Sequence, residues 1–265
     1  MIERLHEVAL SREEIDEILF RCGTEALLVG GQALAIWAEY YEVEPVGELS
    51  GKVTLDADFI GTRQVAEKLR AALGWHIFLP TMDDASSHTA KVSITLPNGG
   101  VKQVDFLNGI VGLDTARVQS RAAELELVSG TRIRILNPLD VMESRLRNLD
   151  ILPSKRNALG VAQAELAIVV VGRFFDGLLE SGEPARIILD AVKRVGQIAL
   201  DARLSRVVFD YALNPLACVP WQRIDSESFR SRRWPQIVAK NQALQRKHAQ
   251  RAARSASRNT GHAGS

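Results

Sequence analysis

The stretch that decides the fold begins Leu27-Leu28-Val29-Gly30-Gly31-Gln32-Ala33-Leu34 and ends Thr54-Leu55-Asp56-Ala57-Asp58-Phe59. Its first part is a short apolar run, typical of a buried strand, followed by two glycines and a series of helix formers. Its last part is rich in β-forming residues and carries two carboxylates two residues apart. The order predicts a strand, a glycine turn into a helix, a loop and a second strand over residues 53–60.

The two carboxylates have a spacing that suits a metal site. Asp56 and Asp58 occupy positions i and i+2 of the predicted strand, so both side chains should leave the same face of the sheet. Adjacent carboxylates repel each other unless a cation compensates them, and Mg²⁺ prefers carboxylate, water and phosphate oxygens. The alternative is a pair of solvent-facing residues on an edge strand, although Asp is depleted in strands.

A third carboxylate, Asp105, lies in the later β-type run Val104-Asp105-Phe106-Leu107. The turn signal Pro97-Asn98-Gly99-Gly100 predicts that residues 101–107 pair back on 91–96 as a hairpin. Such a hairpin could bring Asp105 beside the first two carboxylates. Three carboxylates together could hold a pair of ions around a phosphorus atom.

The glycine pair lies at a predicted strand-to-helix turn. A helix start presents free backbone N–H groups and the positive end of the helix dipole, and glycines let a phosphate approach closely. The alternative is a tight turn that uses Gly30 and Gly31 only for their backbone angles.

In this combination and order the sequence resembles the nucleotidyltransferase fold superfamily. It looks most like the AbiEii-type abortive-infection toxin nucleotidyltransferases, which often read Gly-Gly-x-Ala-Leu and Ser/Thr-x-Asp-x-Asp-Phe. The run Leu136-Asn137-Pro138-Leu139-Asp140-Val141-Met142 also resembles the Pro-led helix start that follows their catalytic sheet. The resemblance covers roughly residues 25–150.

The resemblance implies Mg²⁺-dependent transfer of an NMP from an NTP, such as ATP, to a hydroxyl of RNA, protein or a small molecule, with loss of pyrophosphate. Gly30 and Gly31 would bind the triphosphate. Asp56 and Asp58 would ligate two Mg²⁺ ions. Asp105 would be a third ligand that also helps to activate the acceptor hydroxyl. A cognate antitoxin is a further partner implied by the toxin relatives.

The sequence departs from that family at several points. Gln32 stands where many members have Ser or Thr, although its amide could donate to a phosphate. Lys155 could reach a phosphate from the helical half, with a solvated loop as the alternative. The interval from Gly31 to Asp56 is longer than in compact members, and the helical half lacks a match to their Arg/Lys-Asp pattern. These departures leave acceptor recognition open. The alternative function is a catalytically inactive, nucleotidyltransferase-like binding protein of regulatory or antitoxin type.

The element pattern predicts a mixed α/β part followed by a C-terminal helical subdomain. The resemblance implies that the α/β part is a nucleotidyltransferase-like mixed sheet flanked by helices. The predicted divisions are a 1–137 α/β domain, a 138–245 helical subdomain and a 246–265 disordered basic tail. The end of the chain is rich in Ala, Arg, Ser and Gly and lacks an apolar period. Helices are predicted at about 139–149, 160–180, 184–197 and 201–212.

The composition is that of an ordinary soluble protein, with 265 residues, 46% hydrophobic and 25% charged. Two cysteines are too few for a disulfide framework and indicate a reducing compartment. The N-terminus does not read as a signal peptide, and the apolar run within Val161–Leu179 is interrupted by charges and predicts a buried helix rather than a membrane span. We therefore expect a cytoplasmic protein with no membrane partner.

The net charge of +1 conceals an asymmetry. From Arg230 onward the chain has seven Arg, two Lys and no Asp or Glu, so this end carries a formal +9 and residues 1–229 about −8. A basic end on an acidic body could contact nucleic acid, although a solvated tail is the commoner reason for such a charge run.

Overall fold

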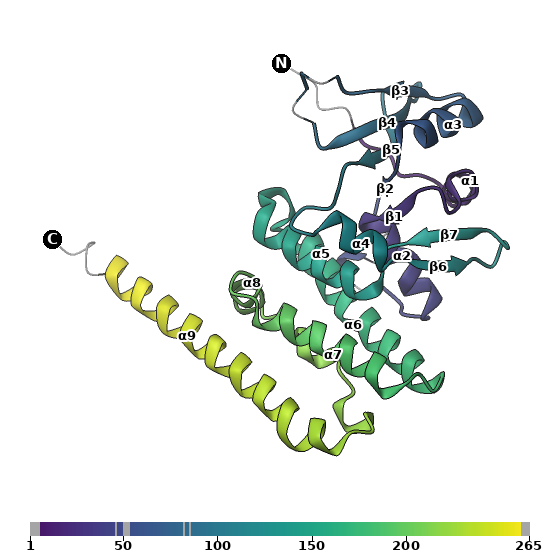
Figure 1. Cartoon of the computed structure of the whole chain (residues 1–265). Coiled ribbons are helices and arrows are strands. Elements are labelled where there is room, and N and C mark those ends of the chain that lie inside the picture. Colours follow the sequence, from purple (N-terminus) through teal and green to yellow (C-terminus); the bar gives the residue numbers. More distant parts are fainter. Residues whose placement is uncertain (1–5, 46, 50–53, 82, 85, 261–265) are drawn as a thin grey trace. The chain divides into compact units, whose positions relative to one another are not determined.

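The computed structural model describes residues 6–45, 47–49, 54–81, 83–84 and 86–260. The chain divides into two compact units, Met1–Ser144 and Arg145–Ser265 (Figure 1). The predicted change from mixed α/β to helical structure near residue 137 coincides with the start of helix α5 (Pro138–Ile151), which crosses the division between the units.

The first unit is organised around a seven-stranded mixed sheet with the strand order β3-β4-β5-β2-β1-β7-β6. The pairs β1–β7 and β2–β5 are parallel, and the other neighbours are antiparallel. The predicted mixed sheet with helices around it is confirmed. The strands are β1 Leu27–Val29, β2 Ala57–Ile60, β3 His76–Phe78, β4 His88–Thr95, β5 Val101–Leu107, β6 Ala123–Glu126 and β7 Arg132–Ile135.

The centre of the sheet is its most apolar part. All three residues of β1 are buried, as expected for a short strand covered on both faces. On the neighbouring strands, Phe59 of β2 and Phe106 of β5 stack with ring centroids 5.7 Å apart. Both rings are almost fully buried. These aromatic contacts fix β2 against β5 and thereby fix the residues next to them.

The hairpin of β4 and β5 forms as the turn signal predicts. Thr95 pairs with Val101 across the turn, and Gly99 there has a φ of +81°, a conformation that glycine adopts without steric cost. Counting outward from this turn places Lys91 directly opposite Asp105. The turn therefore determines which β4 side chain lies beside the third carboxylate.

Three helices of eleven residues each pack around the sheet. Helix α1 (Arg12–Cys22) contacts β7 and α3 (Arg63–Leu73), α3 contacts β3 and β4, and α2 (Gly30–Tyr40) contacts β1 and β2. A shorter helix, α4 (Thr115–Ser120), follows β5. The Nε1 of Trp37 on α2 donates to the backbone oxygen of Leu136, 2.7 Å away in the interior.

A capping box closes the start of α1. The backbone N–H of Glu14 donates to Ser11 Oγ, and the Glu14 carboxylate accepts from the backbone of Ser11. Lys102 on β5 also donates to this carboxylate, at 2.7 Å. Burial alone would raise the pKa of Glu14, but these hydrogen bonds outweigh it and hold that pKa below its ordinary value. The box thus ties α1 to the sheet as well as closing the helix.

The prediction of a strand over residues 53–60 is wrong at its start. Strand β2 begins at Ala57, and Asp56 lies in a bend just before it. Residues 50–53 lie outside the described part of the chain. The hydroxyl of Thr54 donates to Asp56 Oδ1 at 2.8 Å, and such local side-chain bonds favour turns over ladder pairing. The partner strand β1 also has only three residues with which to pair.

The second unit is helical, so the predicted helical character of this part of the chain is confirmed. Its helices after α5 are α6 Ala158–Glu180, α7 Ala185–Leu200, α8 Leu204–Asp210 and α9 Trp234–Thr260. Asn157 caps α6 through a 2.8 Å bond to the backbone of Gly160. By length and apolar composition α6 could cross a membrane, yet half of its most apolar window is buried in the structure, which agrees with the predicted buried helix.

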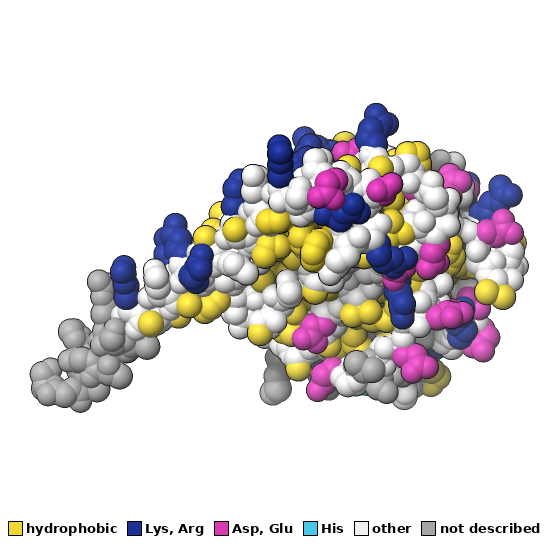
Figure 2. All heavy atoms as spheres, turned by 90° about the horizontal axis from the view of Figure 1, so that it is seen from below, with side chains coloured by type: hydrophobic (Ala, Val, Ile, Leu, Met, Phe, Trp, Pro, Cys, Tyr) yellow, Lys and Arg dark blue, Asp and Glu magenta, His cyan; other side chains and the backbone are white. Residues whose placement is uncertain are grey.

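The prediction of a disordered tail from residue 246 is wrong for its described part. Helix α9 continues without a break to Thr260, and residues 261–265 lie outside the described range. Ala, Gln, Lys and Arg are strong helix formers, so an end without an apolar period can still extend a helix that has begun on packed residues. Figure 2 shows dark-blue basic side chains spaced along this helix as it runs toward the grey C-terminal residues.

One buried polar contact holds the middle of α9 against α8. His248 is 6% exposed, and its Nε2 lies 3.1 Å from Ser205 Oγ on α8. Its ring also lies 5.9 Å from the ring of Phe209. Burial, with the nearby Arg206 and Arg251, lowers the pKa of His248. The helix is therefore fixed at this point by a buried imidazole.

Candidate metal centre

The structure brings the three predicted carboxylates together. Asp58 on β2 pairs in register with Asp105 on the parallel strand β5, and Asp56 lies just before β2. One oxygen from each carboxylate lies within 4.8 Å of the others. A separation beyond about 8 Å would have excluded ions shared at roughly 4 Å. The predicted cluster is therefore present in the fold.

Asp105 has the most enclosed environment of the three. Its side chain is 9% exposed, and its Oδ1 accepts no hydrogen bond. Lys91 Nζ lies 3.4 Å from Oδ1, and His88 Nε2 lies 3.7 Å from Oδ2. A buried carboxylate oxygen without a hydrogen bond costs free energy unless a cation compensates it. Lys91 supplies part of that charge, and the oxygen keeps capacity for a further cation.

Asp56 is oriented by a neighbouring hydroxyl and by the glycine pair. Thr54, which donates to Asp56, packs directly on Gly31, where a Cβ would lie 2.7 Å from the Thr54 hydroxyl oxygen. Any side chain on Gly31 would displace Thr54. The second glycine of the motif thus makes room for the residue that orients the first carboxylate.

Gly30 makes room for the second carboxylate. A Cβ on Gly30 would lie 2.1 Å from Asp58 Oδ2 and 2.9 Å from Asp58 Cβ. Its φ of +70° is also a conformation that favours glycine. Gly30 is the first residue of α2, so the carboxylate of Asp58 lies against the start of this helix. The pair predicted to bind phosphate therefore also shapes the carboxylate cluster.

The donor set suits a hard divalent cation. Three carboxylates supply only oxygen ligands, and Mg²⁺ is bound in proteins by one or two carboxylates with waters and substrate phosphates. The buried Asp105 Oδ1 without a hydrogen bond is the kind of group that a cation would satisfy. Asp56 and Asp58 are partly exposed, which leaves access for a ligand from solvent.

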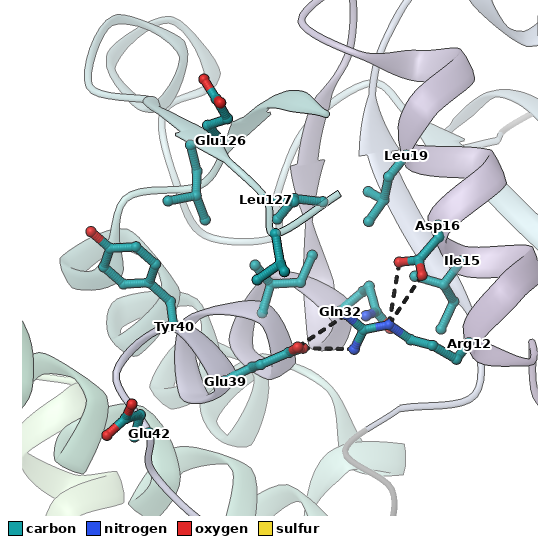
Figure 3. A pocket seen from close by; sticks show the side chains of 13 residues that line it. Arg12, Ile15, Asp16, Leu19, Gln32, Glu39, Tyr40, Glu42, Glu126 and Leu127 are labelled. Atoms are coloured by element: carbon teal, nitrogen blue, oxygen red, sulfur yellow. Dashed lines mark hydrogen bonds and ion pairs between the residues drawn. The ribbon is translucent and has the colours of Figure 1, made fainter. Parts of the chain in front are cut away.

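Gln32 does not join this cluster. Its side chain is 8% exposed and lines a separate cavity of about 260 Å³ bounded by α1, α2 and the β6–β7 hairpin (Figure 3). None of the three carboxylates lines that cavity. Arg12 lies there too, held by Glu39 at 2.7 Å and by Asp16. The position of Gln32 gives no support to the predicted contact between its amide and a phosphate.

Lys155 belongs to the second unit. It is exposed at the end of a short 3₁₀ turn, Pro153–Lys155, whereas the carboxylates belong to the first unit. Its contact with a nucleotide stays a prediction.

Three residues at the centre were missed from the sequence. Lys91, Thr54 and His88 are not among the site residues that the sequence predicts. The hairpin register was available as a signal for Lys91, because equal distances from the turn place it opposite Asp105. His88 was hidden by a register shift between His88 and Ala90, since an irregularity of this kind changes which face a side chain occupies.

Comparisons with known proteins find only structures of low similarity to this chain. No protein-family model and no curated protein matches the chain. Eight chains of solved structures match. JHP933 from Helicobacter pylori is 12% identical with a TM-score of 0.33, over 95% of this chain and 100% of that one. The Megavirus polyadenylate synthase is 14% identical with a TM-score of 0.37, over 66% of this chain and 37% of that one. The functional case therefore rests on the geometry of the site itself.

Proposed function

We propose that the chain is a Mg²⁺-dependent nucleotidyltransferase that moves an NMP from an NTP to a hydroxyl acceptor. The observation that carries this proposal is the carboxylate cluster of Asp56, Asp58 and Asp105, with oxygens within 4.8 Å of one another, next to the glycine start of α2. Two ions are expected there. When bound, Mg²⁺ would act as a Lewis acid on the phosphate oxygens and neutralise the charge that develops on them.

The chain's own residues would position the reactants. Backbone N–H groups of Gly30 and Gly31 at the start of α2 would donate to triphosphate oxygens, which the helix dipole also favours. Lys91 adds a cation beside the cluster. In the transfer, the acceptor oxygen forms a bond to the α-phosphorus and the bond from that phosphorus to the bridging oxygen breaks. Pyrophosphate leaves, and the hydroxyl proton passes to Asp105, the carboxylate that the resemblance assigns to activation of the acceptor.

The proposal also covers the acceptor and the biological setting of the reaction. The resemblance to AbiEii-type toxins favours RNA, protein or a small molecule as acceptor and control by a cognate antitoxin. The small number of cysteines favours action in the cytoplasm.

A second candidate is a catalytically inactive binding protein of regulatory or antitoxin type. The observation that favours it is the ammonium of Lys91, 3.4 Å from Asp105 Oδ1, because an internal cation could permanently compensate the third carboxylate. In that case, replacement of Asp56 and Asp58 by Ala would leave the biological effect of the protein intact.

Nucleotide binding is tested by thermal unfolding. With Mg²⁺ present, at least one NTP at about 100 times its Kd is expected to raise Tm by roughly 5–10 °C, because a ligand that binds only the folded state stabilises it. EDTA should abolish the shift, and so should the double variant Asp56→Asn/Asp58→Asn. If none of the four common NTPs changes Tm in the presence of Mg²⁺, the proposal fails.

A further inference from the structure

Helix α9 of the second unit carries a face of basic side chains. Lys240, Lys247, Arg251 and Arg254 are exposed and follow one another at intervals of seven, four and three residues. In an α-helix these intervals return to the same face. At a rise of 1.5 Å per residue, the four side chains are distributed along about 21 Å of the helix.

This row continues into a groove between α7 and α9. The groove has a volume of about 360 Å³, and Lys240 lines it together with Lys193 of α7 and Arg233. The amides of Gln197 and Gln236 also line it, and no acidic residue does so. The groove and the row on α9 together form one surface, here called the basic surface. Its cations are Lys193, Arg233, Lys240, Lys247, Arg251 and Arg254.

The basic surface draws most of its cations from a segment that contains no acidic residue. No Asp or Glu occurs from Arg230 to the end of the chain, so α9 offers no carboxylate of its own. Within the described ranges, the ion pairs include neither Lys240 nor Lys247. Several cations elsewhere are paired, for example Arg63 with Glu67 at 2.8 Å and Lys68 with Glu25 at 2.7 Å. An ordinary solvated face mixes both signs of charge.

The helix that carries the row is fixed within its unit. His248 anchors α9 to α8 through Ser205. Gly196 on α7 lies against Ile237 of α9, where a Cβ would be 3.6 Å from the Ile237 side chain. Cations on a helix held in this way keep their mutual spacing, which lowers the entropic cost of engaging several anions at once.

We infer that the basic surface binds the phosphodiester backbone of a nucleic acid without regard to sequence. A row of Lys and Arg side chains matches a polymer that carries one negative charge per nucleotide, and counterion release drives such binding. The groove lining supplies cations and amides but no aromatic ring, so it suits phosphate and sugar rather than base stacking. The surface would bind in this way whether or not the carboxylate cluster transfers nucleotides.

The inference is tested with the full chain and fluorescein-labelled oligonucleotides of about 30 nucleotides, by fluorescence anisotropy across a salt series. Four kinds of oligonucleotide are tested separately: single-stranded RNA, single-stranded DNA and the duplex of each, all of mixed sequence. Comparison of their affinities shows which nucleic acid the surface binds. With six cations engaged, the slope of log K against log salt for a single strand is expected near −4. The variant Lys240→Gln/Lys247→Gln/Arg251→Gln should have a slope near −2 and bind about 100-fold more weakly at ~0.1 M salt.

A matched control variant removes the same charge elsewhere. Arg63→Gln/Arg132→Gln/Arg186→Gln also lacks three exposed cations, and its affinity should stay within about threefold of the native value. Circular dichroism and the NTP-induced Tm shift check both variants for folding and for the carboxylate site. An equal loss in both variants, no binding in any arm, or binding only to vesicles containing anionic lipid would overturn the inference.

Discussion

Replacement of Asp58 by asparagine is expected to weaken Mn²⁺ binding by at least about 100-fold and to remove NTP-dependent transfer. The side chain keeps its size, but one of the three clustered carboxylates becomes a neutral amide. Asp58 is the central member of the cluster. It lies on β2 beside Asp105 of the neighbouring strand β5, and it also lies against Gly30 at the start of α2. Mn²⁺ serves as the probe because electron paramagnetic resonance counts the free ion directly and needs no knowledge of the acceptor.

A matched control for this prediction is Asp83→Asn. Asp83 is an exposed carboxylate of the same unit, and it lies outside the carboxylate cluster. Its replacement should leave the Mn²⁺ affinity within about twofold. Equal Mn²⁺ affinities for the native chain and the Asp58→Asn variant would show that the cluster does not hold the ion.

Gly30→Ala is expected to lower the free energy of unfolding by about 2–4 kcal/mol and to abolish NTP binding. The new Cβ would lie 2.1 Å from Asp58 Oδ2, and rotation of the carboxylate would leave it 2.9 Å from Asp58 Cβ. The backbone of α2 and β2 would have to separate, which would move the carboxylate away from the helix start. Urea denaturation gives the stability, and the NTP-induced Tm shift reports the site.

Gly74→Ala separates the contact from the backbone strain. Gly74 has nearly the same φ, +68° against +70° for Gly30, but nothing lies within 4 Å of its Cβ position. The cost of the left-handed conformation alone, about 1 kcal/mol, is therefore expected there, with NTP binding unchanged. If the two variants lose equal stability and both bind NTP, Gly30 has no special relation to Asp58.

The sequence contained enough information to bring the three carboxylates together. Alternation in residues 91–96 and the turn at Pro97–Gly100 gave the β4–β5 hairpin, and an apolar β1 before the glycines gave the strand beside β2. Hydrophobic period and turn chemistry are local signals, so both could be interpreted from one chain. The same register would also have identified Lys91.

The details around the cluster depend on contacts that a single sequence does not reveal. Asp56 precedes the strand because Thr54 bonds to it, and short-range side-chain bonds of this kind are not visible in β-propensity. Gln32 follows the glycine pair in sequence, yet one further step around α2 turns its side chain into another cavity. Consecutive residues of a helix point in directions about 100° apart, so residues adjacent in sequence can line different sites.

The end of the chain shows the limit of composition as a signal. Residues after Arg246 lack an apolar period, which favoured disorder, but the buried His248 and the packed start of α9 extend the helix to Thr260. A helix that has nucleated on packed residues propagates through strong helix formers at little cost. Because this segment is helical, its Lys and Arg side chains form an ordered row along α9.

The central claim is that Asp56, Asp58 and Asp105 form the metal centre of a nucleotidyltransferase. Its most direct test is incubation of the purified full chain with each α-³²P-labelled NTP and Mg²⁺, together with pools of RNA, protein and small-molecule hydroxyl acceptors. We expect label in one acceptor pool with release of pyrophosphate, and loss of both with EDTA or in Asp58→Asn. Label in no pool from any NTP, or equal labelling by native chain and variant, would contradict the claim.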